Sequence, residues 1–482
     1  MSENTPRNRS ERETALAEKA AATDIQAYLD RLCARVKAKE LHPELREEMR
    51  GHIEELMAGK MDQGAPPDEA AEWALAQMGD ADEVGGTLGR VHRPRLNWLL
   101  FVPLAVMIAI GMTAIFSLDA SPDSQMIYSM IAGSQAFYYG LGAAVLIACR
   151  LFDYRLFKKY AVVLYAFTVL FTMFAMTYAS VRINGNLGWI NIGGVSLNWP
   201  LCMFVLLLIA LPGVFERLRL RGRSRYHYRQ IGAVVLLVIP AALHLHFHML
   251  GWLLMLLYLA AGLLIYIRAG GTRLYAFAVP AGAAAFMTAI YLRSDYWQMK
   301  FRAVLAPGTG EAQESYVNNA MSAAIREAGW WGHGFGSRNR ALPYAHAESI
   351  FPYVTYSFGW IVAGVLAAAI IGLTVVLFRT LLAIREHYGR SLAIGLSVLL
   401  AGQLLYGLGA SFSLLPFTTL LMPFIGSGGS STLVHCAIVG LILGVYRRKD
   451  MLPYAPRAAA KEAGGLEDRA AVSGTGRVGG QR

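Results

Sequence analysis

Charged side chains are scarce in this sequence. Asp, Glu, Lys and Arg make up 16% of its 482 residues, whereas hydrophobic residues make up 55%, and the mean hydropathy is +0.40. An ordinary water-soluble domain contains about 25% charged residues. The composition therefore excludes that class and indicates a polytopic membrane protein. We expect it to be all-α because its apolar stretches have the length of membrane-spanning helices.

Cysteine is also rare. The four cysteines are scattered singly, with no zinc-binding spacing and no obvious disulfide partner. The segment HLHFH, residues 244–248, contains three histidines. His244 and His248 are four positions apart, a spacing that suits a metal on one helix face, and His246 lies opposite. A third ligand is not identifiable in the sequence, so a histidine cluster at the membrane interface is favoured. We predict no metal site and no cofactor. A divalent metal ion that assists the activity stays an open alternative.

Basic residues give the chain a net charge of +11. They fall mostly in short segments between apolar stretches, where the positive-inside rule places them on the cytoplasmic side. This distribution argues against nucleic-acid binding. It predicts that the chain contacts membrane lipids.

The N-terminal region differs from the rest in composition, since it is charged and has a helical pattern. It contains no apolar run long enough for a signal peptide. We expect residues 1–22 to be disordered and residues 23–95 to form a small cytoplasmic helical bundle. The segments LREEMRGHIEEL and ALAQMGDADEV resemble the small helical prefix domain that precedes many membrane permeases and envelope proteins in Gram-positive bacteria.

Residues 96–449 contain ten apolar stretches of bilayer length, each about 17 to 25 residues long. Basic loops follow every second stretch, which predicts a bacterial cell-membrane protein with both termini in the cytoplasm and a long external loop at 294–352. The tail at 450–482 is predicted to be disordered. The expected spans are 97–117, 127–149, 160–182, 199–216, 230–248, 250–268, 273–293, 353–378, 391–413 and 431–446.

Three segments on the predicted external side are rich in glycine: LPFTTLLMPFIGSGGSS at 415–431, AIREAGWWGHGFG at 324–336 and NGNLGWINIGGVSL at 184–197. In order, topology and motif, they resemble the FtsW/RodA/SpoVE (SEDS) family of cell-cycle and shape proteins. The resemblance implies the SEDS membrane fold and a role in cell division or cell-shape control.

A fourth segment, LPYAHAESIF at 342–351, resembles the family's L-P-E-A-H-T-D-F-I-F. The functional acid of the family falls on Glu348. The resemblance implies a peptidoglycan glycosyltransferase that polymerises lipid II, an undecaprenyl-pyrophosphate-linked substrate, with a class B penicillin-binding protein as partner. It makes Glu348 the catalytic base and His346 its support. The candidate substrate-binding residues are Arg302, Arg338, Arg340, Trp189, Ser430 and Ser431.

Several polar positions of the family pattern are apolar here. Leu187 and Gly188 replace an arginine pair before Trp189, and Val317 and Ala320 replace two glutamines. Such changes favour an alternative, a catalytically inactive scaffold that binds a partner or a lipid-linked precursor. A transporter is disfavoured because charge within the spans is nearly absent.

Overall fold

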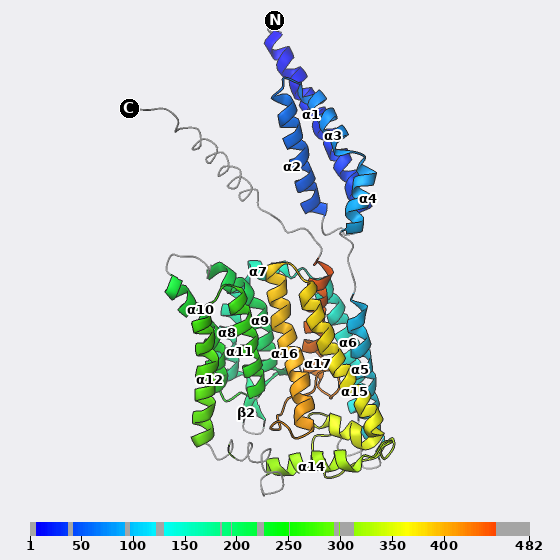
Figure 1. The fold of residues 1–482 in the computed structure, drawn as a ribbon, viewed down its shortest axis with the longest axis vertical. Coiled ribbons are helices and arrows are strands. Elements are labelled where there is room, and N and C mark those ends of the chain that lie inside the picture. The colour runs from blue at the N-terminus through cyan, green and yellow to red at the C-terminus, as the bar shows by residue number, and fades with distance from the viewer. Residues whose placement is uncertain are drawn as a thin grey trace, which may run out of the picture. The chain divides into compact units, whose positions relative to one another are not determined.

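The computed structural model describes residues 6–36, 42–91, 97–121, 130–183, 186–193, 195–218, 226–249, 251–293, 298 and 313–449. These residues form two compact units, one before residue 96 and one from Leu96 to Lys449 (Figure 1). The predicted tail at 450–482 lies outside the described residues.

The first unit contains α1 (Pro6–Arg35), α2 (His42–Met61), α3 (Pro67–Met78) and α4 (Ala81–Val91). Leu29, Leu32 and Ile53, apolar positions at helical spacing in the sequence, are fully buried in its core. α1 begins at Pro6, inside the segment 1–22 for which the sequence predicts disorder. That segment is rich in Ala, Glu and Arg, which have high helix propensity.

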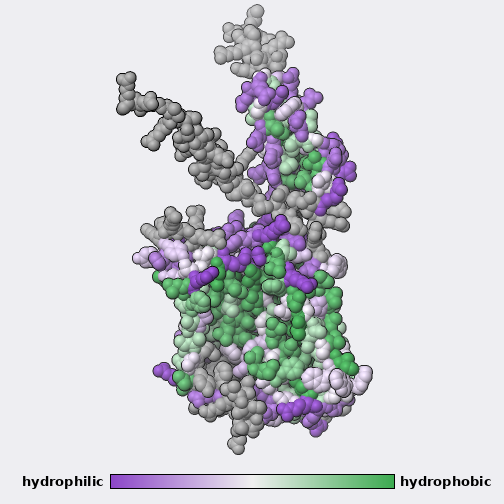
Figure 2. Space-filling model, in the orientation of Figure 1, coloured by the Kyte–Doolittle hydropathy of each residue, from purple (hydrophilic) through white to green (hydrophobic). Residues whose placement is uncertain are grey.

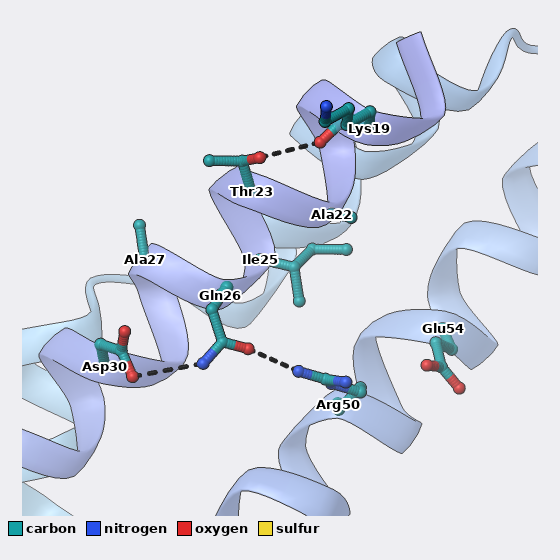
Figure 3. Close-up of a pocket in the computed structure, with 9 residues that line it drawn as sticks. All are labelled: Lys19, Ala22, Thr23, Ile25, Gln26, Ala27, Asp30, Arg50 and Glu54. Atoms are coloured by element: carbon teal, nitrogen blue, oxygen red, sulfur yellow. Dashed lines mark hydrogen bonds between the residues drawn. The ribbon is translucent and has the colours of Figure 1, made fainter. Parts of the chain in front are cut away.

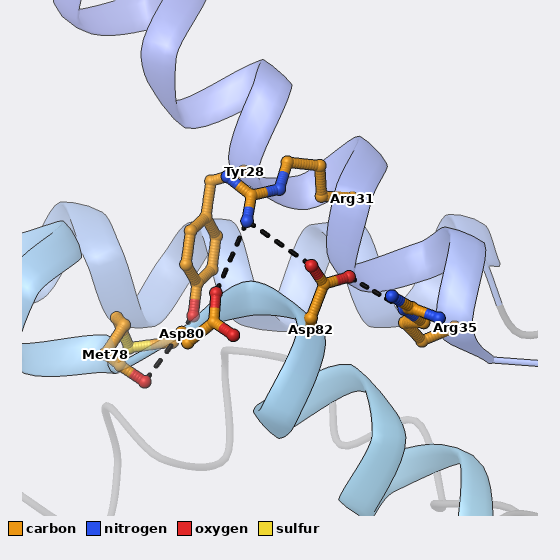
Figure 4. Close-up of polar contacts among 6 residues, drawn as sticks. All are labelled: Tyr28, Arg31, Arg35, Met78, Asp80 and Asp82. Carbon is orange, nitrogen blue, oxygen red and sulfur yellow. Dashed lines mark hydrogen bonds and ion pairs between the residues drawn. The ribbon is translucent and has the colours of Figure 1, made fainter.

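Charged side chains join α1 to the start of α4 (Figure 4). Arg31 contacts Asp80 at 3.3 Å and Asp82 at 3.4 Å, and Arg35 contacts Asp82 at 2.7 Å. All of these side chains are partly exposed to solvent. Such exposed pairs contribute little to stability, so the apolar core holds this unit together.

A groove of about 630 Å³ runs between α1 and α2 (Figure 3). Ile25 lies in the groove, and Gln26 is hydrogen-bonded to Asp30 and to Arg50 across it.

The second unit is the membrane unit. Its helices are α5 (Trp98–Asp119), α6 (Ile131–Leu151), α7 (Arg155–Lys159), α8 (Ala161–Tyr178), α9 (Trp199–Leu218), α10 (Tyr226–His246), α11 (Trp252–Arg268), α12 (Arg273–Arg293), α14 (Gln313–Glu327), α15 (Ile350–Ala383), α16 (His387–Ser411) and α17 (Gly429–Arg447).

The long helices of this unit coincide with the ten predicted stretches. Among the described residues, eight of these helices are long and apolar enough to cross a membrane, and α11 is a shorter apolar helix of 17 residues. α12 matches the predicted stretch at 273–293 but is not one of the eight. Figure 2 shows the apolar surface as a band between two polar ends. The prediction of a helical, multi-pass membrane protein is confirmed.

One part of the membrane unit is not helical. Strands β1 (Ser180–Ile183), β2 (Asn186–Ile192) and β3 (Val195–Asn198) form an antiparallel sheet in the order β1-β2-β3 between α8 and α9. The membrane unit is mostly helical, as predicted, and this small sheet is an addition that the all-α prediction did not contain. The sequence explains why a sheet forms here. An Asn-Gly pair and a Gly-Gly pair separate short runs of β-branched and aromatic residues, which is a hairpin pattern.

Small residues allow the membrane helices to approach closely. A Cβ on Gly440 of α17 would lie 2.5 Å from the Leu146 carbonyl oxygen of α6, and one on Gly142 would lie 2.8 Å from Cys436 Sγ. Such close backbone contact is the usual means of helix association in lipid. It places the start of α17 beside the start of α6, where the candidate site lies.

Candidate functional site

The loop before α15 presents the predicted acid. It follows α14 at one end of the membrane unit (Figure 1). The backbone amides of Ala347 and Ser349 both donate to the Tyr344 carbonyl, at 2.9 and 3.1 Å, and close a tight turn. Ala345, Ala347 and Ser349 are buried. The alternate residues His346 and Glu348 are only partly buried.

The Glu348 carboxylate is poorly solvated. Its Oε2 is buried and has no hydrogen-bond partner among the described residues. Burial raises the pKa of Glu348, and a hydrogen bond from its own backbone offsets part of that rise. Burial lowers the pKa of His346, which favours the neutral imidazole near pH 7. A carboxylate short of solvation is a stronger base than one in water, as a proton acceptor in catalysis requires.

The glycine-rich segment before α17 packs against this loop. The backbone amide of Ser427 donates to the His346 carbonyl at 2.7 Å. A Cβ on Gly426 would lie 2.9 Å from the Ala347 carbonyl oxygen, so only a glycine allows the two backbones to approach this closely. Two motifs about 80 residues apart in the sequence therefore meet in one place.

Ser430 and Ser431 lie in the first turn of α17, and each is 5% exposed. The backbone amide of Asn198, at the end of β3, donates to Ser430 Oγ at 3.3 Å. Asn198 is paired with Trp189 across the sheet. The small sheet thus connects Trp189, which is half-buried, to the start of α17.

The segment at 324–336 packs against a break in α15. Gly359 has φ 81° and ψ 176°, which interrupts the helix. The amides of His333 and Gly334 donate to the carbonyls of Tyr356 and Ser357 at 3.0 and 2.9 Å. These bonds satisfy carbonyls that the break leaves without helical partners, as the interior of a membrane protein requires.

Comparison with known proteins identifies the family. The family model of the FtsW/RodA/SpoVE cell cycle proteins matches residues 97–451. The chain belongs to this family. The match spans most of the chain and corresponds to the membrane unit.

Curated relatives of this FtsW/RodA/SpoVE protein include two named as probable peptidoglycan glycosyltransferase FtsW. The one from Saccharophagus degradans is 25% identical over 378 residues, which cover 73% of this chain and 92% of the relative. The one from Geobacter metallireducens is 27% identical over 328 residues, covering 66% and 85%.

Solved structures show the same fold. A chain from a peptidoglycan synthase complex that coordinates polymerization and crosslinking aligns with a TM-score of 0.60 at 21% identity, covering 74% of this chain and 99% of that one. The rod shape determining protein RodA of Thermus thermophilus aligns with a TM-score of 0.53 at 21% identity, covering 73% and 97%. At these identities the likeness establishes the fold alone.

Two of the three arginines predicted to bind substrate, Arg338 and Arg340, lie within ten positions of Glu348 in the sequence. Arg338 is half-buried and Arg340 is exposed. Both lie between the glycine-rich segment at 324–336 and Glu348. Arg302 lies outside the described residues.

The histidines of HLHFH do not share one helix face, because α10 ends at His246 and His248 lies in the following turn with φ 48°. His244 is buried and its ring lies 5.4 Å from that of Phe204. Within the described ranges, no group of three or more His, Cys, Asp or Glu side chains is arranged to hold a metal ion.

Sequence reasoning missed two polar clusters in the spans. Ser117 Oγ and Tyr353 OH lie 2.9 Å apart, and Ser117 also accepts from the amide of Gly336 at 2.8 Å. Gln135 of α6 contacts the segment before α17. The available signal was a polar side chain inside an apolar stretch, which usually faces the protein interior.

Proposed function

We propose that this FtsW/RodA/SpoVE protein is a peptidoglycan glycosyltransferase that polymerises lipid II at the outer face of the cell membrane. The observation that supports it most is the Glu348 carboxylate, whose Oε2 is buried without a hydrogen-bond partner among the described residues. The relatives named as glycosyltransferases support the same reaction class. The reaction belongs to cell division or cell-shape control.

In this proposal Glu348 takes the proton of a sugar hydroxyl. The hydroxyl oxygen forms a bond to the anomeric carbon of a second lipid-linked sugar, and the bond from that carbon to the pyrophosphate breaks. The bonding electrons leave with undecaprenyl pyrophosphate, and Glu348 then returns its proton to water. A positioned base of this kind contributes about 10²- to 10⁴-fold in rate.

The other candidate residues have distinct roles. His346, as a neutral imidazole, supports Glu348. Arg302, Arg338 and Arg340 neutralise the leaving pyrophosphate, because a guanidinium group can bind two phosphate oxygens at once. Ser430 Oγ accepts a hydrogen bond from the backbone amide of Asn198. The hydroxyl proton of Ser430 is therefore available for a substrate oxygen. Ser431 extends the contact along α17, and Trp189 offers a flat face to a sugar ring.

The end of the unit that contains α14 faces the cell exterior in this proposal, and both termini lie in the cytoplasm. Cations gather at the opposite helix ends, as the positive-inside rule requires of a cytoplasmic face. They are Arg150, Arg155, Lys158, Lys159, Arg217, Arg268, Arg273, Arg379, Arg385, Arg390, Arg447, Arg448 and Lys449.

A class B penicillin-binding protein is the proposed partner. The support is the likeness of this chain to a chain from a peptidoglycan synthase complex. The α1–α4 unit, for which we propose a cytoplasmic position, has no part in the proposed reaction.

Purified full-length protein incubated with fluorescent lipid II tests the proposed function. We expect glycan polymer, resolved as a ladder on a gel, and rescue of growth in a strain depleted of its own SEDS protein. Absence of polymer together with absence of rescue would favour the catalytically inactive scaffold.

A further inference from the structure

Gln135 is a buried amide near the start of α6, with 2% of its surface exposed. Its Oε1 accepts from the Gly428 amide at 3.1 Å, and its Nε2 donates to Thr432 Oγ1 at 3.0 Å. The Thr432 hydroxyl in turn donates to the Gly428 carbonyl at 2.9 Å. Both halves of the amide are therefore paired, which removes the cost of burying it in an apolar span.

Tyr139 lies one helical turn after Gln135, on the same face of α6. Its hydroxyl donates to the Phe424 carbonyl at 3.0 Å. Phe424 has φ 64°, a left-handed conformation that side chains rarely adopt. α6 thus holds both ends of the 424–428 turn, at Phe424 and at Gly428.

The same turn contacts the loop of the proposed base. Ser427 donates to the His346 carbonyl at 2.7 Å, and Gly426 lies against the Ala347 carbonyl. A displacement of the turn therefore moves the backbone on the N-terminal side of Glu348.

We propose that Gln135 is a positioning residue: through the 424–428 turn it fixes the loop that presents Glu348. The proposal rests on the proposed function for its activity readout, and on geometry alone for its labelling readout. A misplacement of about 1 Å at a reacting group costs on the order of 100-fold in rate.

Gln135→Leu removes the amide at nearly constant volume. The matched control is Gln230→Leu, because Gln230 of α10 is also fully buried and holds the turn at Gly270–Thr272, which is not part of the proposed site. We expect similar losses of melting temperature in detergent for both variants. Only Gln135→Leu should lower kcat, by roughly 10- to 100-fold with KM within about twofold.

Thr432 gives a second pair of variants if Gln135→Leu does not fold. Thr432→Val removes the hydroxyl that accepts from Gln135 at nearly the same shape, and Thr432→Ser keeps it. We expect Thr432→Val to lower kcat and Thr432→Ser to restore it. Equal kcat for the valine and serine variants would contradict the proposal.

A labelling readout separates this proposal from the proposed function. Ala347 is 7% exposed. In a protein whose four native cysteines are replaced by alanine, Ala347→Cys should react with a membrane-impermeant maleimide about tenfold faster after Gln135→Leu, since a tenfold change corresponds to about 1.4 kcal/mol of local opening. Gln230→Leu should leave the labelling rate unchanged.

If the parent protein makes no polymer, the proposed function fails and the labelling still decides the positioning. Faster labelling with Gln135→Leu alone would support it. Equal labelling in the two variants, or an unchanged kcat in Gln135→Leu, would overturn it.

Discussion

The two units of this protein connect their helices in different ways. In the α1–α4 unit, charged side chains pair on the surface, as Arg35 and Asp82 do at 2.7 Å, around a small apolar core. In the membrane unit, small residues bring helices together and buried amides and hydroxyls connect loops, as Gln135 does. The difference follows from the surroundings, because water screens exposed charges whereas lipid leaves a buried polar group no alternative partner.

This contrast makes Glu348 stand out. The described carboxylates of the α1–α4 unit at Asp30, Asp80 and Asp82 all have basic partners. Glu348 has a buried oxygen with no hydrogen-bond partner within the described part of the chain. Burying a carboxylate oxygen without a partner lowers the stability of the fold. Such a carboxylate is expected at a functional site, where its reactivity is needed.

The pH dependence of polymerisation should show a large effect. A base acts only when deprotonated, and the pKa of Glu348 is raised, so activity is present above that raised pKa and is lost as the pH falls through it. Below the pKa the rate should fall about tenfold per pH unit. A pH–rate profile checks this, and an acidic limb at or below the ordinary glutamate pKa of about 4.3 would contradict it.

Gly359→Ala should destabilise the membrane unit. A Cβ there would lie 2.2 Å from the Trp330 carbonyl oxygen, and φ is 81°. We expect a loss of about 1–3 kcal/mol, seen as a lower melting temperature in detergent. Gly364→Ala on the same helix is the control, because its Cβ meets nothing within 4 Å. Equal melting temperatures for the two variants would mean that the break in α15 is not required.

Asp82→Asn should show the smallest effect. It removes the negative charge that pairs with Arg31 and Arg35, but both ion pairs are exposed to solvent and screened. In thermal melts of a fragment ending near Arg90, Leu29→Ala should lower stability by about 2–5 kcal/mol because Leu29 is fully buried. A loss for Asp82→Asn as large as that for Leu29→Ala would show that surface charge, not the core, holds the α1–α4 unit together.

The helices were predictable because apolar runs of bilayer length have few alternatives to a helix. The sheet at β1–β3 was missed because its strands are only four to seven residues long and contain turn residues that also suit a loop. The break at Gly359 was missed because it lies inside a continuous apolar run, where hydropathy does not change.

The candidate site was predictable only in part. Resemblance to the family singled out Glu348 and the segment at 415–431, and the structure brings Ser427 onto the carbonyl of His346. The connection through Gln135 was not predictable, since it joins residues almost 300 positions apart. Roles for Arg338 and Arg340 stay predictions, as do the substrate contacts assigned to Trp189 and the α17 serines.

The most direct test of the account compares two neutralised glutamates on the same side of the membrane unit. Glu348→Gln keeps the shape of the proposed base and removes its ability to take a proton, while Glu327→Gln makes the same change at an exposed residue at the end of α14. With fluorescent lipid II, we predict that Glu327→Gln forms polymer like the parent and that Glu348→Gln is slower by about 10²- to 10⁴-fold. Equal polymer from both variants would contradict the account.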